Sequence, residues 1–204
     1  MWSLASFTAL VLAVAADPTV GPQPAPIGVP EALLARTTMP EASGIAWSPT
    51  LQRYLVVSDD TGDKASGTNH APWLFAMSRD GVFDSTPIPI LGLDKLNDAE
   101  ALCAGPGGTF LLATSHSRTR KGKDKAERQR LLVLRVPGPG ARTLLVEASV
   151  DLTALLADAQ VAPDGQVDIE AMAYREDALY LGLKAPLTAA GAAQIVRVRP
   201  FAAA

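Results

Sequence analysis

Cysteine and histidine are scarce in this 204-residue chain, which has one cysteine, Cys103, and two histidines, His70 and His116. A single cysteine excludes an internal disulfide, and no zinc-ligand spacing occurs. The chain also lacks a phosphate-binding glycine loop, a dinucleotide fingerprint and the Gly-x-Ser-x-Gly elbow of serine hydrolases. We therefore expect Cys103 to fill a buried, apolar strand position.

An excess of positive charge is also absent, since 18 Lys and Arg face 21 Asp and Glu, for a net charge of −3. This balance argues against general binding to nucleic acid. Hydrophobic residues make up 48% of the chain, which is enough for one globular domain with its own core. Sixteen Gly and sixteen Pro are many for a helical protein and favour short strands joined by turns.

The apolar run near the start of the chain, residues 4–16, is too short to span a bilayer, so no stable membrane span is expected. Residues 1–16 carry no charged side chain and end in small residues that suit signal-peptide cleavage after Ala15 or Ala16. The start lacks the usual Lys or Arg, and a hydrophobic arm is the alternative. We predict a signal peptide over 1–16, a proline-rich tether over 17–30, a folded domain over 31–204, and a secreted or periplasmic location.

Three segments of the chain begin alike, each with a Glu-Ala step, at Glu41, Glu100 and Glu170. Each is followed by a turn and then by an apolar, β-rich run, at 54–58, 110–114 and 179–183. A loop and a third run come next, at 73–77, 130–136 and 194–198. Continuous apolar runs of this length suit strands that are covered on both faces. The pattern predicts an all-β, propeller-like repeat of antiparallel blades.

Hairpin geometry places the three glutamates at one end of the predicted sheets. Folding each segment about its turn puts every glutamate opposite or beside a strand end: Glu41 with Asp60, Glu100 with Ser115 and His116, and Glu170 with Leu183 and Lys184. A one-residue slip would exchange the faces. If the Glu-Ala strands are innermost, these groups converge on the mouth of a channel, where propellers usually bind ligands.

Several segments resemble an uncharacterised bacterial family that is considered propeller-like. The resemblance rests on three motifs: Glu41-Ala42-Ser43-Gly44, Ser115-His116-Ser117-Arg118 before Lys121-Gly122-Lys123, and Ile169-Glu170-Ala171 before Leu181-Gly182-Leu183-Lys184-Ala185-Pro186. It covers roughly residues 40–198. A looser similarity extends to phytase-like esterase propellers and calcium-dependent phytases, and it implies a calcium-assisted phosphoester or ester hydrolase.

Three units are fewer than the four or more blades of a closed propeller. The number of units has three alternative explanations. The chain is a truncated relative of the family, or it closes its ring as a homo-oligomer, or it forms an open stack with residues 32–38 as an extra strand. An open stack would leave sheet edges to protect.

Carboxylates that converge on one axis need a cation among them. Calcium suits Glu41, Glu100 and Glu170, because it takes six to eight oxygen ligands. Four aspartates would add oxygens: Asp59, Asp60, Asp98 and Asp168. The alternative is structural pairing of the glutamates with backbone N–H groups, Lys184 or Arg118.

Two further features carry candidate chemistry. His116 beside Glu100 is a candidate catalytic base or metal ligand, with a structural hydrogen-bonding role as the alternative. The loop 118–130 holds seven of the 18 basic residues and is either an anion-binding loop or a solvated hairpin.

The leading functional hypothesis is an exported module that binds a small anionic or cation-bridged ligand at the mouth. Its ligand-binding residues would be Glu41, Asp60, Glu100, Ser115, His116, Arg118, Glu170 and Lys184. The first alternative is the calcium-assisted hydrolase, in which calcium polarises the substrate and His116 transfers protons. The second is a truncated or scaffolding protein without a site.

Overall fold

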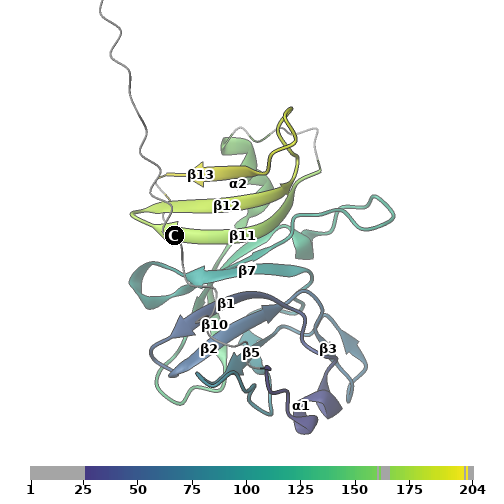
Figure 1. Cartoon of the computed structure of the whole chain (residues 1–204), viewed down its shortest axis with the longest axis vertical. Helices are drawn as coiled ribbons and strands as arrows, with labels where there is room; N and C mark the ends of the chain where they lie inside the picture. Colours follow the sequence, from purple (N-terminus) through teal and green to yellow (C-terminus); the bar gives the residue numbers. More distant parts are fainter. Residues whose placement is uncertain (1–25, 160, 162–165, 200, 202–204) are drawn as a thin grey trace, which may run out of the picture.

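The computed structural model describes residues 26–159, 161, 166–199 and 201, and within them the protein is an all-β, propeller-like fold (Figure 1). Its strands form three blades that follow one another along the chain. Blade 1 contains β1 (Ala42–Ser48), β2 (Arg53–Ser58), β5 (Trp73–Met77) and β6 (Ile88–Leu91). Blade 2 contains β7 (Ala99–Ala104), β8 (Phe110–Thr114), β9 (Arg130–Arg135) and β10 (Leu144–Asp151). Blade 3 contains β11 (Asp168–Arg175), β12 (Ala178–Ala185) and β13 (Gln194–Val198).

Blades 1 and 2 are joined into one eight-stranded sheet with the order β1-β2-β5-β6-β10-β9-β8-β7. Within each blade the neighbouring strands are antiparallel, and the blades meet through a short parallel pairing of their outermost strands, β6 and β10. The two ends of this sheet, β1 and β7, lie against each other. The result is a nearly closed, barrel-like sheet, with blade 3 packed on its outside (Figure 1).

The central strands are buried on both faces, as their apolar sequences predicted. On β8, Phe110 and Leu112 face a core enclosed by blades 1 and 2, whereas Leu111 and Ala113 face a second core shared with blade 3. This alternation follows from the two-residue period of a strand. A third, smaller core on the outer face of blade 1 packs Phe75 and Met77 against Leu33.

The sequence-predicted runs correspond to the first three strands of each blade, and the structure adds two outer strands, β6 and β10. β6 is four residues long and contains Pro89, which hides its strand character in the sequence. β10 reads Leu-Leu-Val-Glu-Ala-Ser-Val-Asp, a partly polar pattern that suits a strand with one exposed face.

Residues 32–38 were considered as an extra strand, and this prediction is wrong, because helix α1 spans Glu31–Arg36. Its sequence, Glu-Ala-Leu-Leu-Ala-Arg, consists of good helix formers, with an acid in the first turn and a base in the last. Leu33 on this helix is fully buried against the outer face of blade 1. Tertiary packing stabilises this six-residue helix, since so short a helix is marginal alone.

The remaining elements are short. The structure contains helix α2 (Leu152–Asp158), two single 3₁₀ turns (Pro106–Gly108 and Ala126–Arg128), and the hairpin β3 (Gly62–Asp63) with β4 (Thr68–Asn69). No helix in the described part of the chain has the length and apolar character needed to cross a membrane.

The predicted tether partly belongs to the folded domain. Gly28 pairs with Val82 in a parallel bridge, and its backbone N–H donates to the Gly81 carbonyl at 2.8 Å. The ordered pairing therefore begins before Glu31. The predicted signal peptide over 1–16, and the tether up to residue 25, lie outside the described residues.

The first strand of every blade carries a β-bulge near its start. The strand register shifts between Ala42 and Gly44 in blade 1, between Ala99 and Ala101 in blade 2, and between Ile169 and Ala171 in blade 3. The residues inserted by these bulges are Ser43, Glu100 and Glu170. A bulge bends its strand and re-aims the side chain at that point.

The residue after each bulge is small, and in blade 1 it must be glycine. A Cβ atom added to Gly44 would lie 2.6 Å from the backbone nitrogen of Leu102 and 3.1 Å from the backbone carbon of Ala101. Both atoms belong to β7, so Gly44 allows the two ends of the barrel-like sheet to meet.

We predict that Gly44→Ala destabilises the fold by about 1–3 kcal/mol, because the added methyl group meets backbone rather than a movable side chain. Gly138→Ala is the matched control, since its Cβ would have no atom within 4 Å and its φ is not positive. We expect the control to be neutral or slightly stabilising. Denaturant unfolding measures both, and equal stability of the two variants would contradict a tight β1–β7 seam.

Candidate ligand-binding site

Backbone hydrogen bonds tie the three blades together at the end where the bulges lie. The N–H of Asp98 donates to the Asp59 carbonyl at 3.0 Å, which joins blade 2 to blade 1. The N–H of Ser115 donates to the Asp98 carbonyl at 2.9 Å, and the N–H of Ile169 donates to the Ser115 carbonyl at 2.8 Å. These three bonds cross from blade 1 to blade 3, and we call the end of the fold that they form the mouth.

Five carboxylates from all three blades gather at the mouth: Asp59, Asp98, Glu100, Asp168 and Glu170. The half-buried Glu100 carboxyl is affected by all the others. Burial, followed by the negative charges of the other four, raises the pKa of Glu100 from its usual 4.5 to about 7. Glu100 is therefore partly protonated near neutral pH.

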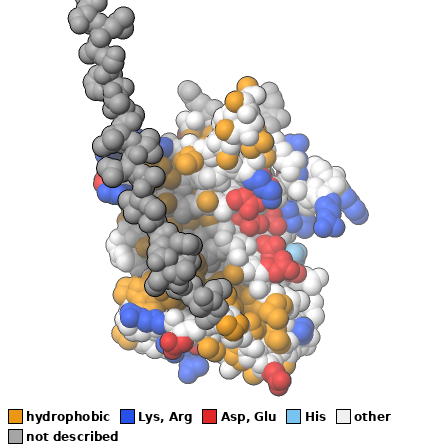
Figure 2. Space-filling model, viewed as in Figure 1, with side chains coloured by type: hydrophobic (Ala, Val, Ile, Leu, Met, Phe, Trp, Pro, Cys, Tyr) orange, Lys and Arg blue, Asp and Glu red, His pale blue; other side chains and the backbone are white. Residues whose placement is uncertain are grey.

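Two cations compensate the edges of this cluster. The Nζ atom of Lys184 lies 2.6 Å from Glu170 Oε1 and 3.7 Å from Asp168 Oδ2. Arg128 Nη1 lies 3.0 Å from Asp98 Oδ2. Neither reaches Glu100 within ion-pair distance, so negative charge prevails at the centre of the mouth. Figure 2 shows acidic side chains gathered on this face of the molecule, with Lys and Arg side chains beside them.

The Lys184–Glu170 pair is the structural pairing considered from the sequence. Their hydrogen bond and the nearby Asp168 raise the pKa of Lys184. The pKa of Asp168 is raised by burial, against the opposing effect of Lys184. Because the Lys184 side chain is 66% exposed, this pair contributes little to stability and mainly sets the charge at the edge of the mouth.

The Ser-His-Ser motif anchors the basic loop to the mouth. The hydroxyls of Ser115 and Ser117 both donate to Asp98 Oδ2, and Arg128 Nη1 donates to Ser117 Oγ at 3.0 Å. Asp98 and His116 have φ values of 62° and 59°, in the left-handed region. Such backbone conformations are strained for these residues and persist where surrounding contacts fix them. Ser115 is therefore a supporting residue beneath the carboxylates.

His116 lies apart from Glu100, against helix α2. Its Nε2 atom is 3.1 Å from Thr153 Oγ1, and burial lowers its pKa, with Asp151 and Asp124 opposing that shift. The ring is therefore mostly neutral at pH 7. The predicted His116–Glu100 pair does not form, because the left-handed turn at His116 carries its side chain toward the start of α2.

Three other predicted site residues lie outside the acidic cluster. Glu41 precedes the ladder, where its backbone N–H donates to Ser58 Oγ at 3.0 Å. Asp60 lies 3.9 Å from His70 Nδ1, and Arg118 pairs with Asp124 at 3.0 Å. Arg118 therefore neutralises a carboxylate of its own loop and none of the three glutamates.

The predicted three-glutamate calcium set is not assembled. Within the described residues, no group of three or more His, Cys, Asp or Glu side chains is arranged to hold a metal ion. The bulges explain why Glu41 does not join the other two glutamates. By strand register, Ser43 in blade 1 is equivalent to Glu100 and Glu170, and Glu41 is equivalent to Asp98 and Asp168.

Sequence reasoning missed Arg128 and Ser117, which hold Asp98 in place. It also aligned the Glu-Ala steps directly, although the stronger signal was the acid-x-Glu step shared by Asp98-Ala99-Glu100 and Asp168-Ile169-Glu170. Aligning blade 1 on that step would have placed Ser43 at the third position. The mouth therefore has glutamates from only two blades, and Asp59 supplies the carboxylate from blade 1.

We predict that Glu100→Gln becomes more stable than wild type as pH rises. The pKa of Glu100 is about 7 in the folded protein and near 4.5 in the unfolded chain. Between these values the folded state binds more protons, so the wild type loses stability as pH rises through that window. The variant lacks this loss, and its Tm should exceed the wild-type Tm by a few degrees at pH 8 and match it near pH 4.

The matched control for this experiment is Glu176→Gln, in the turn between β11 and β12 at the opposite end of blade 3. Glu176 is exposed and pairs with Arg175. Its substitution should leave the pH dependence of Tm unchanged. A pH-independent difference between Glu100→Gln and wild type would contradict the raised pKa.

Comparisons with known proteins do not place this chain in a family. No family model matches the chain, and no curated protein matches it. Among solved structures, a chain of the hydrazine synthase of Kuenenia stuttgartiensis aligns at 10% identity with a TM-score of 0.20. The alignment covers 80% of this chain and 51% of that chain, so this protein spans about half the length of the structure it matches. A similarity at this level carries no argument about function.

Proposed function

We propose that this is an exported, propeller-like binding protein whose mouth takes its ligand through a positive charge. That charge belongs either to the ligand itself or to a divalent cation that bridges to an anionic ligand. The observation that carries the proposal is the position of Glu100, whose half-buried carboxyl lies among four others and has no cation of its own within ion-pair distance among the described residues.

The electrostatics at the mouth support a cationic group over a bare anion. Five carboxylates outnumber the two cations, Lys184 and Arg128, that contact them. An incoming positive charge would replace the proton on Glu100 and remove the repulsion that raises its pKa. Binding should therefore release protons near pH 7 and strengthen as pH rises.

The basic loop gives the mouth a second, opposite charge nearby. Arg128 at its end is fixed to Asp98, and the loop also carries Arg120, Lys121, Lys123 and Lys125. The loop extends beside the sheets in Figure 1. A ligand with one positive and one negative group, or a cation-bridged anion, would match this arrangement.

The hydrolase alternative receives no specific support. Its proposed proton-transfer residue, His116, hydrogen-bonds to Thr153 and forms no hydrogen bond or ion pair with the five carboxylates of the mouth. Binding without hydrolysis is therefore the simpler function for this site.

Titration calorimetry of the folded protein tests the proposal. The probes are calcium chloride and a small diamine such as putrescine, each at pH 6 and pH 8. We expect at least one of them to bind, with roughly tenfold higher affinity at pH 8. Glu100→Gln should weaken binding at least tenfold at pH 8, whereas Glu176→Gln should leave it unchanged.

Two outcomes would overturn the cationic-ligand proposal. One is the absence of binding by both probes at millimolar concentration. The other is binding that Glu100→Gln leaves intact, which would place the cation elsewhere on the protein.

Export is part of the proposal and rests on the uncharged, apolar residues 1–16. When the full chain is expressed in a bacterium with a periplasm, we expect mature protein outside the cytoplasm. Intact-mass analysis should give a chain that begins at Ala16 or Asp17. Full-length protein that stays in the cytoplasm would contradict export.

A further inference from the structure

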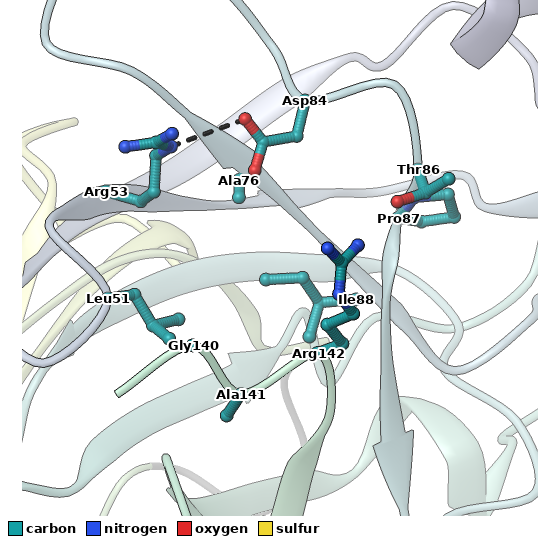
Figure 3. A pocket seen from close by; sticks show the side chains of 10 residues that line it. All are labelled: Leu51, Arg53, Ala76, Asp84, Thr86, Pro87, Ile88, Gly140, Ala141 and Arg142. Carbon is teal, nitrogen blue, oxygen red and sulfur yellow. Dashed lines mark hydrogen bonds and ion pairs between the residues drawn. The ribbon is translucent and has the colours of Figure 1, made fainter. Parts of the chain in front are cut away.

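A pocket lies at the end of the barrel-like sheet opposite the mouth. Three connections form it: the β1–β2 turn, the β5–β6 segment and the β9–β10 turn. The seven residues of β1 separate it from the mouth by about 20 Å, at roughly 3.3 Å per residue. The pocket has a volume of about 240 Å³ and is drawn in Figure 3.

The walls of this pocket mix apolar and polar side chains, with Leu51, Ile88 and Ala141 among the apolar ones. Its polar side chains carry two guanidinium groups, Arg53 and Arg142, one carboxylate, Asp84, and the hydroxyl of Thr86. They leave one net positive charge in the pocket. This is the reverse of the mouth, where negative charge prevails.

The two arginines differ in what they contact. Arg53 Nε lies 3.3 Å from Asp84 Oδ1, and its Nη1 donates to the Gln52 carbonyl. Arg142 makes no hydrogen bond or ion pair with any residue that the structure describes. Figure 3 shows the Arg142 side chain extending from the β9–β10 turn into the pocket, with Ile88 beside it. Its fork of N–H donors is therefore available to a ligand.

We propose that this pocket binds a small organic monocarboxylate. The planar guanidinium of Arg142 would take the carboxylate through two parallel hydrogen bonds, while the apolar body of the ligand packs on Leu51 and Ile88. A cavity of about 150 Å³ accommodates benzene, so 240 Å³ has room for a ring with a carboxylate. Asp84 would repel the second charge of a phosphate dianion, which favours a singly charged ligand.

Ligand titration followed by amide NMR tests this, with benzoate as the probe, benzamide as its neutral isostere and inorganic phosphate as a second anion. We expect benzoate to shift amide signals of the three pocket-forming connections. Benzamide and phosphate should bind at least tenfold more weakly. If benzamide binds as tightly as benzoate, the carboxylate has no role and the proposal is overturned. If phosphate binds as tightly as benzoate, the pocket recognises negative charge alone, which also overturns a site for monocarboxylates.

Three variants make the test specific. Arg142→Gln should weaken benzoate binding at least tenfold. Arg142→Lys should retain part of the benzoate affinity, because an ammonium group keeps the positive charge but lacks the two parallel N–H donors of the guanidinium. Ala141→Leu fills the pocket without changing its charge and should also weaken benzoate binding. Unchanged binding in Arg142→Gln or in Ala141→Leu would overturn the proposal.

Arg175→Gln is the matched control, since Arg175 lies at the end of β11 in blade 3, is exposed and pairs with Glu176, and does not line the pocket. It should leave benzoate binding unchanged, and an equal loss in this variant would indicate non-specific attraction to arginine. Thermal unfolding of every variant separates loss of the pocket from loss of the fold. Because the probes and residues differ, this test succeeds or fails independently of the cation test at the mouth.

Discussion

The architecture of this protein depends on the backbone hydrogen bonds that run from Asp59 through Asp98 and Ser115 to Ile169. Within a blade, the strand ladders satisfy the backbone. Blades 1 and 2 share only the short β6–β10 pairing, and within the described residues no ladder provides a link from blade 3 to either of them. The three bonds at the mouth provide that link at the positions where the first strands begin. They also bring together side chains that carry like charges, because Asp59, Asp98 and Asp168 lie on or next to the linked residues. The same backbone hydrogen bonds therefore link the blades and bring the mutually repelling carboxylates together.

The acidic mouth stays folded because its surroundings offset part of the repulsion. Lys184 compensates Glu170 and Asp168, while Arg128 and two serine hydroxyls hold Asp98. The remaining repulsion is expressed at Glu100, whose pKa rises to about 7. Among the described residues, Glu100 has no partner that would explain the burial of its carboxyl. A buried acid that holds a proton near neutral pH is more typical of a binding position than of a structural one. The rest of the fold is stabilised by the two-sided burial of β8 and β9, which does not depend on the charge of Glu100.

Much of the fold followed from patterns of apolar residues. The runs at 54–58, 110–114 and 179–183 are continuous because their strands are covered on both faces, and that signal is strong. The outer strands β6 and β10 lack it, since one has a proline and the other an exposed face. Residues 32–38 are too few to show a helical period. Their helical conformation depends on the packing of Leu33 on blade 1, which the sequence does not show. The grouping at one end of Glu100, Glu170 and Lys184 was predictable from hairpin geometry. The sequence did not predict that Glu41 lies outside this group. A β-bulge has no clear sequence signature, and each bulge shifts the strand register by one residue.

The two ends of the barrel-like sheet differ in charge for reasons that lie in the strand connections. At the mouth, the bulges of the first strands and the ends of the second strands supply carboxylates, with the basic loop beside them. At the opposite end, short turns place Arg53 and Arg142 around a pocket that also contains apolar side chains and one carboxylate. Side chains on the strands are constrained by packing in the cores, whereas those at turns and bulges are less constrained. Charged side chains therefore collect at the turns and bulges. A ligand with a positive group and a ligand with a carboxylate would then bind at opposite ends of the same sheet, without competing for the same residues.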